Sequence, residues 1–196
     1  MLPKKNICCA VLAGGKAERL PYKPFILLKG KPLVSYALDS AEEYFDETII
    51  IAKKQQEEKL EKITQNKSKI KIIIENSNDF SPWNGIKAAV RNTEAEWIFL
   101  LACDMPFVCA ELFDLMASKI NPDIDCIIPC SERLQPLCAL YRKTVLEKAP
   151  FEGSVTRFAE SLKKEVVRID NANWFFNINA KEDFEEAGEM MKNIRI

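Results

Sequence analysis

The segment ICCAVLAGGKAERLPYKP, residues 7–24, says most about the architecture of this chain. Its apolar part, Ile7–Leu12, predicts a buried strand of a parallel sheet that runs directly into Gly14 and Gly15. Two glycines at the carboxyl end of a strand let backbone N–H groups approach a bound anion closely. Three cations follow the glycines: Lys16, Arg19 and Lys23. Ligands of open α/β sheets bind at this edge, so the segment favours a polyphosphate site there.

The glycine loop matches neither of two common nucleotide-binding motifs. It lacks the GxGxxG pattern, which disfavours an NAD-type oxidoreductase, and it lacks the GxxxxGK[ST] pattern of the P-loop. Two glycines after a strand also occur in a simple tight turn, and Lys16 also fits a solvated surface charge. The residues alone leave both interpretations open.

Composition bounds the class of protein. The chain has 196 residues, 47% of them hydrophobic, which fits one globular domain with a substantial core. The net charge of −1 argues against a general nucleic-acid-binding protein. No apolar run of about 18 residues or more occurs, so no membrane span is expected. We interpret the N-terminus as leading into a first strand rather than as a signal peptide.

Seven cysteines and the absence of histidine exclude several kinds of site. No CxxC pair occurs, so a zinc site is disfavoured, and without histidine the chain cannot build a Ser-His-Asp or Cys-His nucleophilic site. Most of the cysteines lie in apolar runs and are expected to pack as small core residues. Reduced thiols predict a cytoplasmic location.

Strand-like and helix-like segments alternate through the first half of the chain. Strands are predicted at residues 7–12, 48–52, 70–74 and 97–102, and helices at residues 32–44, 53–63, 82–91 and 110–119. Ser81 is the expected N-cap of the third helix, with Pro82 at its first position. Four strand–helix units in succession predict a three-layer α/β/α fold of the Rossmann-like kind, with a predominantly parallel central sheet.

The second half is less regular. Strands are predicted at residues 126–129, 136–141 and 166–169, and helices at residues 155–163 and 181–192. No linker rich in Pro, Gly or Ser separates the halves, so we expect a single domain over residues 1–196. We expect its N-terminal half, about residues 1–108, to bind a nucleotide and its C-terminal half, about residues 109–196, to bind an acceptor.

Asp104 is the next candidate functional residue. The strand predicted at residues 97–102 delivers it to the same sheet edge as the glycine loop. A carboxylate there suits Mg²⁺, which commonly takes one or two protein carboxylates together with substrate phosphates. An aspartate just before Met105-Pro106 also fits a plain turn, and that alternative stays open.

Two asparagines and one glycine complete the candidates. Asn179-x-x-Glu182 has the spacing of a capping box, which predicts Asn179 as the cap of the last helix, whereas Asn177 has no such role and is a candidate site residue. Gly85 lies in the first turn of the helix after Ser81 and costs about 1 kcal/mol of helix propensity relative to alanine. Another chain segment or a nucleotide must approach closely at Gly85, and the residues favour neither.

Five motifs occur in order along the chain. They are LAGG at 12–15, SPWNG at 81–85, LLACDMPFV at 100–108, RLQPLCALYRK at 133–143 and FFNINAKED at 175–183. Together they resemble the molybdenum cofactor guanylyltransferase family over essentially the whole chain. The ordered set is specific to the nucleotidyltransferase superfamily and, more narrowly, to this branch.

The resemblance implies a nucleotidyltransferase fold with GTP as substrate and Mg²⁺ as cofactor. The residues it implies for guanine and ribose are Leu12, Ala13 and Gly14, with Gly85 and Asn76 in the same pocket, and those for the phosphates are Gly15, Arg19 and Lys23. It places Asp104 on Mg²⁺, Asn177 and Asn179 in the catalytic cleft, and residues 153–157 where relatives bind the pterin. Lys23, Arg19, Asp104, Asn177 and Asn179 are thus the implied catalytic set.

The implied reaction joins GMP to the terminal phosphate of molybdopterin and releases pyrophosphate. The acceptor phosphate has a second pKa of about 6 and is largely ionised at neutral pH, so no protein base is required. The resemblance also implies transient contacts with proteins of cofactor synthesis or with apo-molybdoenzymes. The net charge and the lack of a long apolar run predict neither a nucleic-acid nor a membrane partner.

The chain departs from the family pattern at three places. The glycine loop is one residue shorter and carries Pro21 in place of a glycine, so Lys23 is the best alignment for the family's lysine. The family's asparagine after the second strand aligns with Ala52, and its aspartate after the third strand aligns with Asn76, beside Glu75. These positions belong to the nucleotide pocket. The motifs therefore determine the type of reaction better than they determine which nucleotide base the protein prefers. The alternatives are a cytidylyltransferase, a sugar-phosphate nucleotidyltransferase and a non-catalytic nucleotide-binding partner.

Overall fold

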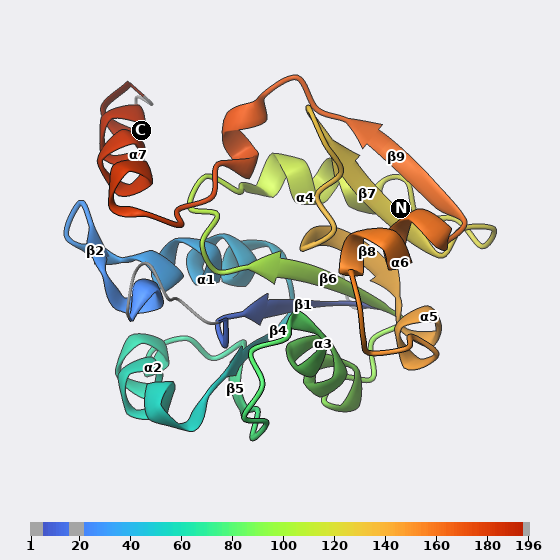
Figure 1. The fold of residues 1–196 in the computed structure, drawn as a ribbon, viewed down its shortest axis with the longest axis horizontal. Helices are drawn as coiled ribbons and strands as arrows, with labels where there is room; N and C mark the ends of the chain where they lie inside the picture. The colour runs from blue at the N-terminus through green and yellow to red at the C-terminus, as the bar shows by residue number, and fades with distance from the viewer. Residues whose placement is uncertain (1–5, 16–21, 194–196) are drawn as a thin grey trace.

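The computed structural model describes residues 6–15 and 22–193, and its centre is a seven-stranded sheet (Figure 1). The strands are β1 (Ile7–Leu12), β4 (Glu47–Ala52), β5 (Ile70–Ile74), β6 (Trp97–Ala102), β7 (Cys126–Cys130), β8 (Cys138–Arg142) and β9 (Lys164–Arg168). Their order is β5-β4-β1-β6-β8-β7-β9, in which β8 runs antiparallel to both neighbours and every other neighbouring pair is parallel. The predicted, predominantly parallel sheet is confirmed.

The apolar strand β1 lies between β4 and β6, and both of its faces are covered. Ile7, Cys9 and Val11 pack into the core on one face of the sheet, and Cys8 and Ala10 pack into the core on the other. A strand buried on both faces has a continuous apolar sequence, which is what the chain carries here.

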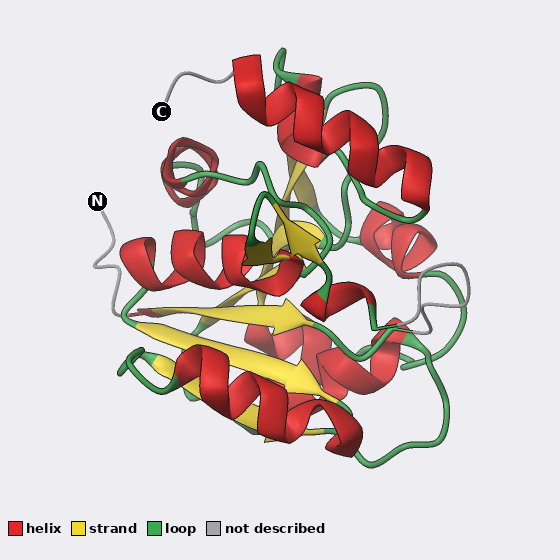
Figure 2. Cartoon of the chain, turned by 90° about the vertical axis from the view of Figure 1, so that its left-hand side faces the viewer, coloured by secondary structure: helices red, strands yellow, loops and turns green. Residues whose placement is uncertain are grey.

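Helices form a layer on each face. On the face of Val11 lie α1 (Leu33–Tyr44), α2 (Glu57–Thr64) and α4 (Ala110–Ala117). On the face of Ala10 lie α3 (Pro82–Arg91), α5 (Lys143–Glu147) and α6 (Val155–Ser161). Figure 2 shows the strands enclosed between helices above and below. The three-layer α/β/α architecture is therefore confirmed, and α5 is a short helix that the sequence pattern did not predict.

Element boundaries agree best where the apolar pattern is strongest. The strands predicted at 70–74 and 97–102 agree with β5 and β6 at both ends, and the Ser81 hydroxyl caps α3 by accepting from the N–H of Trp83. The strand predicted at 136–141 begins later, at Cys138, because the N–H of Cys138 donates to the carbonyl of Gln135 at 3.0 Å in a turn. Local turn bonding of this kind leaves no trace in the apolar pattern.

A small hairpin was also not predicted. Its strands are β2 (Leu27–Leu28) and β3 (Lys31–Pro32), joined by Lys29 and Gly30 at φ of 49° and 81°. Two successive positive φ values suit the tight turns that match strand twist. The hairpin and the last helix, α7 (Lys181–Asn193), share a third apolar cluster: Leu28, Leu33, Phe107, Ile178 and Ala187. This cluster attaches the C-terminal segment beside the end of β6.

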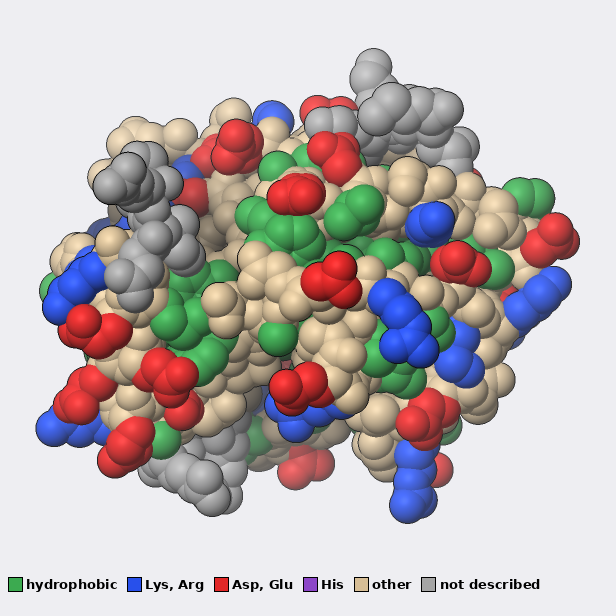
Figure 3. All heavy atoms as spheres, turned by 90° about the horizontal axis from the view of Figure 1, so that it is seen from above, with side chains coloured by type: hydrophobic (Ala, Val, Ile, Leu, Met, Phe, Trp, Pro, Cys, Tyr) green, Lys and Arg blue, Asp and Glu red, His purple; other side chains and the backbone are tan. Residues whose placement is uncertain are grey.

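Acidic and basic side chains are both present on the face that Figure 3 shows. This agrees with the net charge of −1. Among residues 6–15 and 22–193, no helix is both long enough and apolar enough to span a bilayer.

Candidate active site

The carboxyl ends of β1 and β6 lie side by side and position the two main motifs. Leu12 is paired with Ala102 in the parallel register, and the N–H of Cys103 donates to the carbonyl of Leu12 at 3.2 Å. The glycine loop and Asp104 therefore leave the sheet at the same edge, as the predicted parallel direction of the two strands requires.

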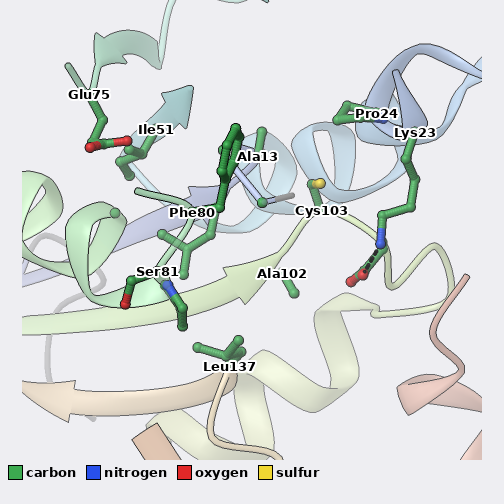
Figure 4. Close-up of a pocket in the computed structure, with 16 residues that line it drawn as sticks. Ala13, Lys23, Pro24, Ile51, Glu75, Phe80, Ser81, Ala102, Cys103 and Leu137 are labelled. Atoms are coloured by element: carbon green, nitrogen blue, oxygen red, sulfur yellow. Dashed lines mark hydrogen bonds and ion pairs between the residues drawn. The ribbon is translucent and has the colours of Figure 1, made fainter. Parts of the chain in front are cut away.

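A pocket of about 240 Å³ opens at this edge (Figure 4). Its lining includes these residues singled out from the sequence: Leu12, Ala13, Gly14, Gly15, Lys23, Gly85 and Asp104. Glu75 and Phe80, from the segment between β5 and α3, complete one side. Figure 4 shows Glu75 and Lys23 at opposite ends of the pocket, with the ring of Phe80 between them. Lys23 and Glu75 are thus separated along the pocket.

Lys23 and Asp104 form an ion pair in this pocket, with 2.6 Å between Nζ and Oδ2. Lys23 begins the short 3₁₀ helix η2 (Lys23–Phe25), in which Pro24 is buried and restricts the backbone. The two side chains are only 15% and 16% exposed, so their charges are shielded from water and interact more strongly than surface charges do.

The other carboxylate oxygen of Asp104, Oδ1, is buried and has no hydrogen-bond partner among residues 6–15 and 22–193. An unpaired buried acceptor is costly unless a ligand fills its place. Mg²⁺ fits this oxygen, because it commonly takes one or two carboxylates and completes its shell with phosphate oxygens and water. The described residues contain no group of three acidic or Cys side chains that could hold a metal, so oxygens from a substrate would be needed beside Asp104.

The glycines of the loop are not required by packing within the protein. Neither Gly14 nor Gly15 has a positive φ. A Cβ at Gly15 would meet no described atom within 4 Å, and one at Gly14 would meet the Lys53 side chain at an ordinary 3.8 Å. Gly85 differs, because a Cβ there would lie 3.0 Å from Cδ2 of Leu12. The close neighbour that the sequence required at Gly85 is therefore strand β1, although Gly85 also lines the pocket.

The segment with the two asparagines is attached to the end of β6 through its backbone. The N–H of Ile178 donates to the carbonyl of Asp104 at 3.0 Å. Asn179 Oδ1 accepts from Lys23 Nζ at 3.1 Å, which makes Asn179 a member of the Lys23–Asp104 group. Asn177 does not bond to Lys23 or Asp104 in the described part of the chain; its side-chain amide donates to the Phe175 carbonyl at 3.0 Å.

The capping box expected at Asn179 and Glu182 is corrected by the structure. The carboxylate of Asp183 accepts from the N–H groups of Asn179 and Ala180, at 2.7 and 2.8 Å, at the start of α7. The helix is thus capped one residue later than the spacing suggested, by a side chain from its own first turn. This leaves the amide of Asn179 directed at Lys23.

A buried ion pair between Lys53 and Glu75 borders the pocket, and Lys53 was not predicted as a site residue from the sequence. Their side chains are 8% and 9% exposed, and Lys53 Nζ also donates to the carbonyls of Ser77 and Asp79 at 2.6 and 2.8 Å. The ring of Phe80 lies over the same ammonium, 5.1 Å away. Lys53 follows β4 directly, so its place at a strand's carboxyl end was a usable signal.

A second pocket, of about 530 Å³, adjoins the first. Its polar lining includes Arg133, Gln135, Thr156, Glu160 and Asn177. The two pockets share Ala102, Asp104 and Leu137. Asp104 thus lies where two binding spaces meet.

Cys103 lines the first pocket without being a nucleophile. Burial, and secondarily the negative charge of Asp104, raises the pKa of its thiol to about 12. The thiol is therefore protonated at neutral pH.

Some predicted residues are not placed at the site. Arg19 and Lys16 lie outside the described residues. Asn76 is not among the residues lining the first pocket, where its neighbour Glu75 is.

Solved structures with this fold include nucleotidyltransferases. A nucleotidyl transferase from Methanothermobacter aligns with a TM-score of 0.81, covering 96% of this chain and 99% of its own, at 14% identity, a likeness that shows the fold. Molybdopterin-guanine dinucleotide biosynthesis protein A from Archaeoglobus fulgidus aligns with a TM-score of 0.76 at 26% identity, covering 95% of this chain and 100% of its own. The fold is that of a nucleotidyltransferase.

Residues 9–164 match the MobA-like NTP transferase domain, and the protein belongs to this family. A probable molybdenum cofactor guanylyltransferase from Clostridium perfringens is 31% identical, covering 90% of this chain and 93% of its own. Another from Natranaerobius thermophilus is 30% identical, covering 93% of this chain and 95% of its own. The resemblance inferred from the five motifs is confirmed.

Proposed function

We propose that the protein transfers GMP from GTP to the terminal phosphate of molybdopterin, yielding the guanine dinucleotide cofactor and pyrophosphate. The names of its relatives support this reaction. The observation that carries the proposal is that two pockets meet at Asp104, one bordered by the glycine loop and Lys23 and the other by Arg133. A transferase needs this arrangement, because donor and acceptor must meet at one point.

In the proposed complex, GTP occupies the first pocket with its phosphates at the Lys23 end. There the side-chain-free loop at Gly14 and Gly15 admits close approach of a phosphate to backbone N–H groups. The base lies at the Glu75 end, against the ring of Phe80. A carboxylate complements the two adjacent donors of guanine, whereas cytosine and adenine present an acceptor beside their amino group. In this structure, however, Oε2 of Glu75 pairs with Lys53 and Oε1 accepts from the N–H of Ser77 at 2.8 Å, so the choice of guanine rests on the names of the relatives.

The acceptor occupies the second pocket. Arg133 is exposed at its wall and forms no ion pair with another described residue, so its guanidinium is available to an acceptor phosphate. Thr156 belongs to the segment 153–157 where the family resemblance places the pterin, and it lines the same pocket. The division into a nucleotide-binding N-terminal half and an acceptor-binding C-terminal half is part of this proposal.

In the reaction, an oxygen of the acceptor phosphate attacks the α-phosphorus of GTP. A new phosphoanhydride bond forms, the bond to the β-phosphate oxygen breaks, and pyrophosphate leaves with the electron pair. The attacking monoester is already largely ionised at pH 7, since its second pKa is about 6. The protein therefore supplies alignment and positive charge rather than a base.

Lys23 is the residue that we assign to the phosphates, with Asn179 beside it. At an effective dielectric constant of about 20, two unit charges 4 Å apart interact by roughly 4 kcal/mol, which would correspond to about three powers of ten in rate if all of it were specific to the transition state. Asp104 would hold Mg²⁺ through the buried, unpaired Oδ1. Bound there, Mg²⁺ neutralises phosphate charge.

Pyrophosphate release tests the proposal. The purified protein, Mg²⁺ and molybdopterin are incubated in parallel with GTP, CTP and ATP, and we expect release with GTP only. Arg133→Ala should raise the KM for molybdopterin and leave that for GTP unchanged, while Arg91→Ala, an exposed arginine of α3, serves as the matched control. Release with CTP instead would establish a cytidylyltransferase, and binding without release would establish a non-catalytic partner.

The proposal extends to the setting of the reaction. All seven cysteines are free thiols, which supports a reducing cytoplasmic location. Transient delivery contacts with proteins of cofactor synthesis or apo-molybdoenzymes are part of the same proposal, because the product is a cofactor that another protein must receive.

A further inference from the structure

Lys23 has two acceptors in the structure. Its ammonium lies 2.6 Å from Asp104 Oδ2 and 3.1 Å from Asn179 Oδ1. The first acceptor carries a negative charge and the second is neutral, so Asp104 holds Lys23 more strongly. The ammonium thus already contacts a second, weaker acceptor, Asn179 Oδ1, toward which it can move.

Asn179 is held in place independently of Lys23. Asp183 accepts from the backbone N–H groups of Asn179 and Ala180, which binds this segment to the first turn of α7. The neighbouring N–H of Ile178 is tied to the carbonyl of Asp104. Because its backbone is fixed on both sides, the amide oxygen of Asn179 stays beside Lys23 when the ammonium moves.

The Lys23 ammonium and a divalent cation would compete for one carboxylate. Oδ1 of Asp104 is buried and free of partners among the described residues, while Oδ2 is already neutralised by Lys23. Two positive charges on the two oxygens of one shielded carboxylate repel strongly. A cation entering at Oδ1 therefore weakens the hold of Asp104 on Lys23.

We propose that Lys23 is the resident counter-ion of Asp104 in the free protein, and that it shifts toward Asn179 when a divalent cation binds Asp104. Asp183 is a positioning residue, because it holds the backbone of Asn179 so that the amide oxygen of Asn179 stays beside Lys23. The inference rests on the proposed function for the identity of the metal site. It adds that Lys23 opposes metal binding in the absence of nucleotide, although it assists the reaction once a triphosphate is bound.

Binding of Mn²⁺ alone, without nucleotide or acceptor, tests this directly. Free Mn²⁺ is measured by electron paramagnetic resonance during titration of the full chain. Lys23→Met should bind Mn²⁺ about tenfold more tightly than the wild type, because the competing charge is gone. Asn179→Ala should bind it about threefold more weakly, because Lys23 then has only Asp104 to hold it.

The expected changes in Mn²⁺ affinity have opposite directions in Lys23→Met and Asn179→Ala. Simple damage to the fold would instead weaken metal binding in both variants. Asp183→Ala should shift affinity in the same direction as Asn179→Ala, whereas Glu182→Ala, its neighbour in the first turn of α7, should have no effect. Lys71→Met, an exposed lysine of β5, is the control for charge removal. Thermal unfolding of each variant checks that the fold is intact.

The outcomes distinguish the inference from the proposed function. If Asp104→Asn abolishes Mn²⁺ binding but Lys23→Met does not strengthen it, Lys23 is no counter-ion and the inference fails while the metal site stands. If Asn179→Ala leaves the affinity for Mn²⁺ unchanged or raises it, Asn179 does not receive the Lys23 ammonium and this part of the inference is wrong. If Asp104→Asn changes nothing, the metal is bound elsewhere, and pyrophosphate release still decides whether the protein is a guanylyltransferase.

Discussion

Gly85 of α3 faces the side chain of Leu12 so closely that a methyl group at position 85 would lie 3.0 Å from Leu12 Cδ2. Both residues line the first pocket, one from a helix and one from a strand. The contact therefore couples the packing of α3 on the sheet to the shape of the proposed nucleotide site.

Gly85→Ala tests this coupling. The added methyl displaces Leu12 into the pocket, while alanine improves helix propensity by about 1 kcal/mol, so the free energy of unfolding should change little. We expect the KM for GTP to rise several-fold, measured by pyrophosphate release, with urea unfolding as the stability control. A KM equal to that of the wild type would mean that Leu12 does not border the nucleotide.

Asp104→Ala should fold normally and lose activity by a factor of about 10³ or more, because it removes the carboxylate assigned to the metal. Circular dichroism checks the fold and pyrophosphate release checks the rate. Near-normal turnover would refute the metal assignment at Asp104.

Lys23→Ala should lower kcat and raise the KM for GTP together, since the lysine is proposed to touch the phosphates in both the ground state and the transition state. Steady-state kinetics against GTP concentration make the measurement, with exposed Lys71→Ala as the control. An unchanged response to GTP would assign the phosphate contact to Lys16 or Arg19 instead.

Lys53→Met should destabilise the protein by about 3 kcal/mol, because it leaves the buried carboxylate of Glu75 without its ion-pair partner. Urea unfolding gives the free energy. Lys62→Met is the control, since Lys62 pairs with Glu58 on the open surface of α2 and should unfold like the wild type. Equal stability of both variants would show that Glu75 finds another partner or becomes protonated.

Thiol labelling tests the burial of the cysteines. Burial raises the pKa of Cys8, Cys103 and Cys126 to about 12. Their reactive thiolate is scarce at pH 8 and grows only as the pH approaches 12. We expect the partly exposed Cys109 and Cys130 to react first with an aromatic disulfide reagent, and the buried thiols to react only after unfolding. Rapid reaction of Cys103 in the folded protein would contradict its place in the core.

Much of the N-terminal half was predictable because its signals are local. The continuous apolar run of β1 identified a strand covered on both faces, and Ser81-Pro82 identified the start of α3. Once strands and helices alternate, the rule that ligands bind at strand carboxyl ends directs attention to Gly14 and Asp104 together.

The missed features depend on contacts between distant segments. The antiparallel direction of β8 and the pairing of Lys53 with Glu75 across two strand ends have no local signature. The bonding of Asp183 to the N–H groups of Asn179 and Ala180 is local, but the spacing of the acidic residues did not decide between Glu182 and Asp183. The hairpin of β2 and β3 is too short to show a period of two, and its place depends on α7.

The amino-acid sequence by itself determined the alternation of strands and helices, the family, and which residues stand at strand ends, because backbone periodicity and turn chemistry act over a few residues. Only the tertiary structure decided that Lys23, Asp104 and Asn179 share hydrogen bonds and that two pockets meet at one carboxylate. Lys23 is separated along the chain from Asp104 by 81 positions and from Asn179 by 156 positions. These contacts form only when burial of the common core compensates the entropy lost in bringing such distant segments together.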